Sequence, residues 1–195
     1  MQIGIKIACL CPLALVLALL ISVPAHSIST EKDSKLRQLL KNAIESNAGF
    51  EDRFDAEVWL LDMSNRLGPF ISDPEERLKL LMNVHYEAKR VNLAPELVLA
   101  LIEVESHFDK FAISISGARG LMQIMPFWLD EIGISDKNLF KIRTNLRMGC
   151  TILRYYMDME SNDLMRALAR YNGSLGSQAY PNKIIKALNT RWFKQ

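Results

Sequence analysis

Apolar residues recur every three or four positions along most of the chain, which is the spacing of an amphipathic helix. No segment alternates apolar and polar residues convincingly, as a half-buried strand would. The pattern therefore predicts an all-α fold. The predicted helices cover residues 36–44, 54–67, 74–92, 95–107, 121–132, 145–160, 164–171 and 184–188.

Several helix boundaries carry local signals. Asp73-Pro74 predicts a start, because an aspartate side chain can cap the first turn and a proline fits within it. Pro95 predicts the start of the next helix, and Gly68-Pro69 predicts the end of an earlier one. We therefore expect a boundary at residues 68–73, between a small N-terminal helical extension (residues 28–73) and the main domain (residues 74–195).

The faces that should be buried follow from the same spacing. On helix 54–67 the predicted buried residues are Phe54, Val58, Leu61 and Leu67. On helix 74–92 they are Leu78, Leu81, Met82, His85 and Ala88.

The first 25 residues have the layout of a secretory signal peptide. A weakly positive start precedes an apolar, uncharged run at residues 7–21, and Val23 and Ala25 suit cleavage after Ala25. An uncleaved membrane anchor is the alternative, but the run is shorter than the ~20 residues of a full span. We expect cleavage, with the mature protein in the periplasm or secreted.

Composition narrows the possible functions. The chain has 195 residues, 49% hydrophobic and 24% charged, which is enough for one buried core. A formal net charge of +2 without a run of like charges gives no sign of a nucleic-acid partner. Cys150 stands alone after the signal segment among apolar neighbours, so we expect a small buried residue and not a nucleophile. The histidines are scattered at His26, His85 and His107, so we expect no metal and no other cofactor.

Two glutamates lie near the end of helix 95–107, which is otherwise mostly apolar. At about 100° per residue, Glu105 shares a face with Val98 and Leu101, whereas Glu103 lies about 160° away. Burial on an apolar face would raise the pKa of Glu105. A carboxylic acid that keeps its proton near neutral pH is what protonation of a glycosidic oxygen requires. The alternative is that Glu105, one turn from the helix end, points into water.

A loop of small residues follows at 114–120. Gly117 and Gly120 would let backbone donors approach a ligand closely. Gln123 adds an amide that can both donate and accept hydrogen bonds. Taken alone, the glycines could equally form ordinary turns, and Met122 and Met125 could be core residues.

The order of these features resembles the signature of the soluble lytic transglycosylase (SLT) family. The resemblance rests on Glu105-Ser106, Ser114, the motif GARGLMQIMP at 117–126, the helix beginning at Asn145, and ARYNG at 169–173. It covers roughly residues 76–186 and does not explain residues 28–73. The family has a helical fold like that of goose-type lysozyme, and the resemblance implies the same fold here.

The resemblance also implies a role for single residues. Glu105 would be the catalytic acid and base, and Ser114 would bond the N-acetyl group of muramic acid. Tyr171 would orient Glu105 or the substrate. The residues implied to contact or shape the sugar subsites are Ser114, Gln123, Met125, Tyr171 and Asn172.

The chain departs from the family pattern in two places. Phe127-Trp128 follows Pro126 where many members have a small residue, and Gly173-Ser174 replaces the frequent Ala-Gly. These departures bear on the subsites more than on the chemistry. The aromatic residues that include possible sugar platforms are Trp128, Tyr155, Tyr156, Tyr171 and Tyr180; for the first three we favour core packing.

Most glycosidases use two carboxylates, and the sequence offers only weak candidates for a second. Asp109 is expected to cap the helix end and the loop, and Asp130 and Glu131 to be solvated. A lytic transglycosylase needs no second carboxylate, because the substrate's N-acetyl oxygen can stabilise the anomeric carbon and its own 6-hydroxyl can close a 1,6-anhydro bond. A lysozyme-like hydrolase and a catalytically silent peptidoglycan-binding protein remain alternatives. A silent protein would have no reason to keep an acid at Glu105.

The expected partners follow from this interpretation. They are the glycan strands of peptidoglycan, with other cell-wall or secretion-machine proteins as a further possibility. We expect a monomer. Within the cell wall, the sequence favours no particular role among turnover, division and assembly of a secretion machine.

Overall fold

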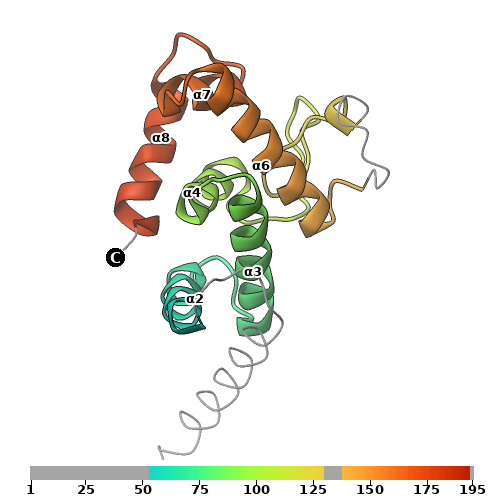
Figure 1. Cartoon of the computed structure of the whole chain (residues 1–195). Coiled ribbons are helices and arrows are strands. Elements are labelled where there is room, and N and C mark those ends of the chain that lie inside the picture. Colours follow the sequence, from blue (N-terminus) through green and yellow to red (C-terminus); the bar gives the residue numbers. More distant parts are fainter. Residues whose placement is uncertain (1–52, 130–137, 194–195) are drawn as a thin grey trace, which may run out of the picture.

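The computed structural model describes residues 53–129 and 138–193 (Figure 1). Within these residues the structure consists of helices and loops, with isolated β-bridges and no strand, so the all-α prediction is confirmed. The helices are α2 (Arg53–Leu67), α3 (Pro74–Arg90), α4 (Pro95–Ser106), α6 (Ile142–Met159), α7 (Leu164–Tyr171), α8 (Ala179–Ala187) and the short π-helix η1 (Leu188–Trp192). None of these helices is long and apolar enough to cross a membrane. The predicted signal segment and the predicted helix at 36–44 lie outside the described residues.

The predicted helix starts are confirmed where a capping signal was present. The side chain of Asp73 accepts a hydrogen bond from the backbone N–H of Glu75 at 3.1 Å, and Pro74 occupies the first turn of α3. Pro95 opens α4, and α7 covers the predicted residues 164–171. These signals act within one turn of the chain, which is why the sequence alone suffices to predict them.

The predicted helix at 121–132 is wrong in its first half. Residues 121–127 form turns and a β-bridge, and Gln123 has a left-handed backbone with φ of +49°. The amide of Met122 bonds to the side chain of Asn145 instead of a carbonyl one helical turn earlier. Helical structure begins at Trp128, and residues 130–132 lie outside the described part. The last predicted helix, 184–188, begins earlier than expected, as part of α8.

The predicted inward face of α2 is also partly wrong. Leu67 is buried as predicted, but Val58 is 53% exposed and Leu61 is 41% exposed, and Leu60 and Met63 are buried in their place. The two sets have the same helical spacing, so periodicity could not choose between them. Packing against α3 and η1 makes the choice. On α3 the predicted face is confirmed, with Met82 only half-buried.

Helix α4 lies at the centre of the fold, against α3, α8 and η1 (Figure 1). All of its residues from Pro95 to Ile102 are buried. Cys150 is buried as predicted, and burial raises the pKa of its thiol, so it is not a thiolate near neutral pH. The core therefore surrounds the helix that carries Glu105.

Helix α2 shares this core, although it precedes the expected boundary at 68–73. Its apolar face joins the same hydrophobic cluster as α3, α4 and α6. Trp59 donates a hydrogen bond to Glu96 on α4 at 2.9 Å, and Arg66 donates to the backbone carbonyls of Arg191 and Phe193. The division into an extension and a main domain stays a prediction, since residues 28–52 lie outside the described part.

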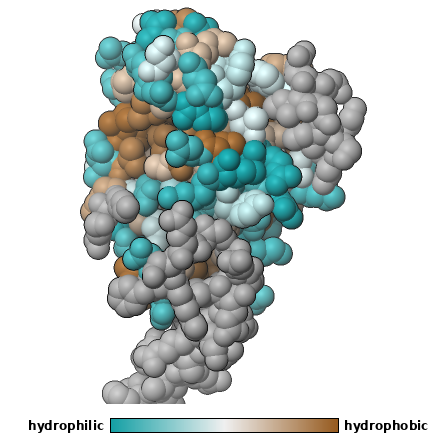
Figure 2. All heavy atoms as spheres, in the orientation of Figure 1, coloured by the Kyte–Doolittle hydropathy of each residue, from teal (hydrophilic) through white to brown (hydrophobic). Residues whose placement is uncertain are grey.

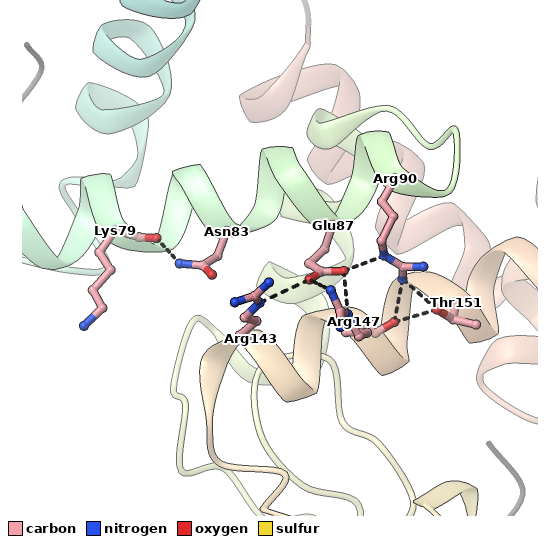
Figure 3. A network of polar contacts seen from close by, with 7 residues as sticks. All are labelled: Lys79, Asn83, Glu87, Arg90, Arg143, Arg147 and Thr151. Atoms are coloured by element: carbon pink, nitrogen blue, oxygen red, sulfur yellow. Dashed lines mark hydrogen bonds and ion pairs between the residues drawn. The ribbon is translucent and has the colours of Figure 1, made fainter. Parts of the chain in front are cut away.

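The seam between α3 and α6 is held by a cluster of charges (Figure 3). Glu87 on α3 is fully buried and accepts a hydrogen bond from Arg90 at 2.7 Å. Arg147 on α6 pairs with the other carboxylate oxygen at 3.2 Å, and Arg143 lies 3.9 Å from it. Arg90 reaches across to Thr151 on α6 at 2.8 Å, so the cluster ties the two helices together.

Candidate active site

Glu105 lies in the last turn of α4, where the buried helix emerges from the core. Its side chain is only partly exposed, and its carboxylate accepts a hydrogen bond from the phenol of Tyr180 on α8. Burial raises the pKa of Glu105 above its ordinary value, and the hydrogen bond from Tyr180 offsets part of that rise. Figure 2 shows a band of apolar residues over α8 and α4.

Tyr180 is the functional candidate that the sequence reasoning missed, apart from its inclusion among the aromatic residues. It is 9% exposed, and burial together with the charge of Glu105 holds its pKa far above the ordinary value. Pro181 is a helix-start signal that was available, since proline favours the first turn. A helix beginning at 179 would have placed Tyr180 on one face with Ile184 and Ala187, which are both buried.

Glu103 has a different environment, in agreement with its predicted place away from the face of Glu105. Its carboxylate accepts a hydrogen bond from the indole of Trp192 at 2.6 Å and pairs with Arg191 at 3.1 Å. Both partners belong to η1, so Glu103 anchors the end of the chain to α4. Glu105, in contrast, forms no ion pair with any residue in the described part of the chain.

The loop after α4 is attached to the helices by side-chain hydrogen bonds. Ser106 donates to the carbonyl of Leu121 at 2.8 Å. Asn145 on α6 is buried and accepts from the N–H of Met122 at 2.8 Å. The amide of Asn145 also donates to the carbonyls of Arg119 at 2.8 Å and Leu139 at 2.9 Å. The predicted start of this helix at Asn145 is wrong, because α6 begins at Ile142, and Asn145 fixes the loop from the first turn of the helix.

Two glycines allow this close approach of loop and helix. Gly120 has φ of +76°, and a Cβ there would lie 2.4 Å from Nδ2 of Asn145 and 2.6 Å from the carbonyl of Leu139. A Cβ on Gly149 would lie 2.3 Å from Sδ of Met122. Any side chain at either position would push the loop off α6.

Ser114 and Gln123 both shape the backbone of the loop. The hydroxyl of Ser114 accepts from the N–H of Ala118 at 3.0 Å, which closes the turn. The amide of Gln123 donates to the carbonyl of Gly120 at 2.9 Å and to that of Ala112 at 3.2 Å. Both side chains are half-buried, and their contacts fix the loop's shape.

The other site residues named from the sequence differ in burial and in their contacts. Tyr171 donates its hydroxyl to the carbonyl of Met122 at 2.7 Å, and burial and the charge of Glu105 raise its pKa. The phenol bonded to Glu105 is therefore that of Tyr180. Met125 is half-buried, and Asn172 is exposed at the end of α7.

The remaining acidic candidates have other contacts or lie outside the described residues. Asp109 accepts from the N–H of Phe111 at 2.8 Å, which caps a turn of the loop and not the end of α4. Asp130 and Glu131 are not described. Across residues 53–129 and 138–193, no group of histidine, cysteine, aspartate and glutamate side chains could hold a metal ion.

Comparison with known proteins identifies the family. Residues 82–191 match the model of the transglycosylase SLT domain, and the chain belongs to this family. The match contains Glu105, the loop, and helices α6 to α8.

Curated relatives match part of the chain at moderate identity. A transglycosylase of Enterobacteria phage PRD1 is 31% identical over 105 residues, which are 50% of this chain and 38% of the relative. Membrane-bound lytic murein transglycosylase F of Desulfosudis oleivorans is 33% identical over 106 residues, 50% of this chain and 23% of the relative. Membrane-bound lytic murein transglycosylase C of Yersinia pestis is 28% identical over 133 residues, 57% of this chain and 37% of the relative. The matched part thus spans less than half the length of each relative.

A solved structure of an inactive mutant of lytic transglycosylase Slt from Pseudomonas aeruginosa is also similar. Its TM-score is 0.46 at 18% identity, covering 83% of this chain and 37% of that chain.

Proposed function

We propose that this protein is a peptidoglycan lytic transglycosylase that cleaves the β-1,4 bond between N-acetylmuramic acid and N-acetylglucosamine. The product would end in 1,6-anhydromuramic acid. The observation that carries the proposal is the environment of Glu105, a carboxyl with raised pKa at the end of a buried helix. Membership of the SLT family and the names of the lytic murein transglycosylases among the relatives support it.

In the first step, Glu105 donates its proton to the glycosidic oxygen as the bond to the anomeric carbon breaks. The raised pKa favours the protonated carboxyl, which is the form that can donate to the leaving oxygen. Tyr180 keeps its own proton and stabilises the carboxylate that forms, because it already donates to this group.

The positive charge on the anomeric carbon is stabilised by the acetamido oxygen of the same sugar. Ser114 would hold that acetamido group. Its hydroxyl oxygen accepts from Ala118, so its hydrogen remains available to donate to the substrate. This arrangement removes the need for a second protein carboxylate.

In the second step, the Glu105 carboxylate takes the proton of the sugar's 6-hydroxyl, and that oxygen bonds to the anomeric carbon. Glu105 is then protonated again, and no water is consumed. The attacking hydroxyl belongs to the same molecule, which gives it a high effective concentration.

The other site residues are proposed to form the sugar subsites. Gln123 and Tyr171 would do so by fixing the backbone at residues 120–122, to which both donate hydrogen bonds. Half-buried Met125 offers an apolar contact, and exposed Asn172 offers an amide to the glycan. We further infer a periplasmic or secreted location, from the signal-peptide layout of residues 1–25.

Mass spectrometry of purified peptidoglycan digested by the protein tests the proposal. We expect muropeptides with anhydromuramic ends, lighter by one water than the corresponding hydrolysis products. Reducing ends would identify a lysozyme-like hydrolase, and intact peptidoglycan would identify a binding protein. Either result would overturn the proposed reaction.

A further inference from the structure

The loop that carries Ser114 has an outer side that takes no part in the proposed reaction. Phe111 is 63% exposed, Ile113 is 65% exposed and Ile115 is fully exposed, all within five residues. Arg119 is exposed as well. A group of large exposed apolar side chains commonly marks a binding surface. We call Phe111, Ile113, Ile115 and Arg119 the outer patch.

The backbone of the loop leaves one edge unpaired at this patch. Ile113 and Arg119 face each other in an antiparallel bridge. The hydrogen bonds of the bridge are made by the flanking residues, from Gly120 to Ala112 at 2.9 Å and from Ser114 to Ala118 at 3.0 Å. The N–H and C=O of Ile113 therefore point to the opposite, outer edge, and neither bonds to any residue in the described ranges.

The bridge also brings a charge beside the exposed apolar residues. Opposite residues in an antiparallel pair have their side chains on the same side, so Arg119 stands next to Ile113. The nearby Lys110 pairs with Glu76 at 2.7 Å. Arg119 has no such partner among the residues that the structure describes. Its guanidinium is thus available for an external anion, such as a carboxylate.

We propose that the outer patch binds the peptide that peptidoglycan carries on its muramic acid residues. This inference rests on the proposed function, in which Ser114 contacts the acetamido group of that sugar. The acetamido group is attached at carbon 2, and the peptide leaves through the lactyl ether at the adjacent carbon 3. A sugar held by Ser114 therefore directs its peptide onto the neighbouring part of the loop.

The chemistry of the patch fits such a peptide. Successive side chains point to opposite faces, so Ser114 lies on one face of the loop and Arg119, beside Ile113, on the other. The unpaired N–H and C=O of Ile113 lie at the edge between these two faces. Peptide amide groups can pair with the N–H and C=O of Ile113 at this edge. Alanine methyl groups can contact Ile113 and Ile115, and the free carboxylates of the peptide can pair with Arg119.

Binding to two forms of one substrate tests the inference. Glycan strands that carry peptides are compared with the same strands after an amidase has removed the peptides. Arg119→Gln in the full chain should weaken binding to peptide-bearing strands about fivefold and leave binding to stripped strands unchanged. Arg119→Lys should restore part of the loss, and Lys89→Gln on the exposed side of α3 is the matched control for loss of one surface charge.

The possible outcomes separate this inference from the proposed function. Equal weakening on both substrates would mean that Arg119 contacts the glycan or the lactyl carboxylate, and no weakening on either would mean that the patch serves another ligand; both results overturn the inference. Wild-type cleavage products are measured on the same samples. Selective binding without anhydro products would support the peptide site and contradict the proposed reaction. Anhydro products without selective binding would support the reaction and contradict the peptide site.

Discussion

The candidate active site and the seams around α6 use different polar chemistry. Glu87, between α3 and α6, is surrounded by three arginines, and Glu160, at the end of α6, accepts hydrogen bonds from Arg166 and Arg170. Glu105 contacts a neutral phenol, and the surrounding loop is fixed by neutral amides and hydroxyls. The arginines lower the pKa of Glu160, whereas burial raises that of Glu105.

Glutamate thus serves two purposes in the same small fold. A carboxyl beside guanidinium groups forms ion pairs that join helices together. Burial of a carboxyl in an apolar place favours its protonated form, which can transfer a proton. The absence of an ion pair to Glu105, within the described residues, is therefore part of the proposed mechanism.

The largest expected effect is that of Glu105→Gln. The amide has nearly the same size but cannot donate a proton to the leaving oxygen, so the cleavage rate should fall by at least ~10²-fold. The rate is measured by release of soluble muropeptides, and the fold is checked by circular dichroism.

Glu103→Gln is the matched control for this variant. Its amide oxygen can still accept from Trp192, so the cleavage rate should stay close to wild type. Activity retained in Glu105→Gln, or lost equally in both variants, would contradict the assignment of Glu105.

Asn145→Ala tests the neutral hydrogen bonds of the loop. It would leave the buried N–H of Met122 and the carbonyls of Arg119 and Leu139 without a partner. We expect the free energy of unfolding to fall by about 2–4 kcal/mol, with a parallel loss of activity. Denaturant unfolding measures this, with Asn83→Ala as control because Asn83 makes one bond at the surface of α3. Equal stability of the two variants would show that Asn145 does not hold the loop.

Tyr180→Phe removes the donor to Glu105 and keeps the ring. We expect the rate to fall about tenfold, as for loss of a hydrogen bond to a charged group. The pKa of Glu105 should rise further without this donor. Because the protonated acid is the active form, the alkaline limb of the pH–rate profile should move to higher pH. Tyr171→Phe, which loses a hydrogen bond to Met122, should leave the alkaline limb in place. A limb that moves in Tyr171→Phe and stays in place in Tyr180→Phe would mean that Tyr171, and not Tyr180, controls the pKa of Glu105.

The smallest expected effect is on stability as a function of pH. A carboxyl with a raised pKa in the fold costs stability as the pH rises, so Glu105→Gln should be more stable than wild type above the pKa of Glu105. Glu160 has a lowered pKa, so its contribution to the stability of the fold is present above the ordinary pKa of glutamate and is lost as the pH falls. Glu160→Gln should therefore be less stable than wild type at neutral pH and approach it in acid. Melting temperatures of the wild type and both variants, measured from acid to neutral pH, test these expectations. Shifts of the same sign in both variants would contradict the contrast between Glu105 and Glu160.

The sequence predicted most of the features that depend on local chemistry. Asp73-Pro74 and Pro95 determine helix starts within one turn, and Glu105 could be assigned to an apolar face by helical geometry. The loop at 121–127 could not be predicted, because its apolar residues match a helix and the competing hydrogen bond comes from Asn145, 23 positions from Met122.

Contacts between distant segments account for the other differences. The buried face of α2 depends on which of two equivalent stripes meets α3 and η1. The bond from Tyr180 to Glu105 joins residues 75 positions apart, and α8 begins before the stretch whose periodicity was recognised. Periodicity contains no information on which helices become neighbours.

Burial of Glu105 raises the pKa of its carboxyl, and the proposed mechanism depends on this rise. NMR titration of isotope-labelled glutamate carboxyl carbons tests this directly, with Glu105→Gln and Glu160→Gln used to assign the two resonances. We expect Glu105 to titrate above the ordinary pKa of glutamate and Glu160 below it. A Glu105 that titrates at or below the ordinary value would contradict its proposed role as the acid, whatever the products of the reaction.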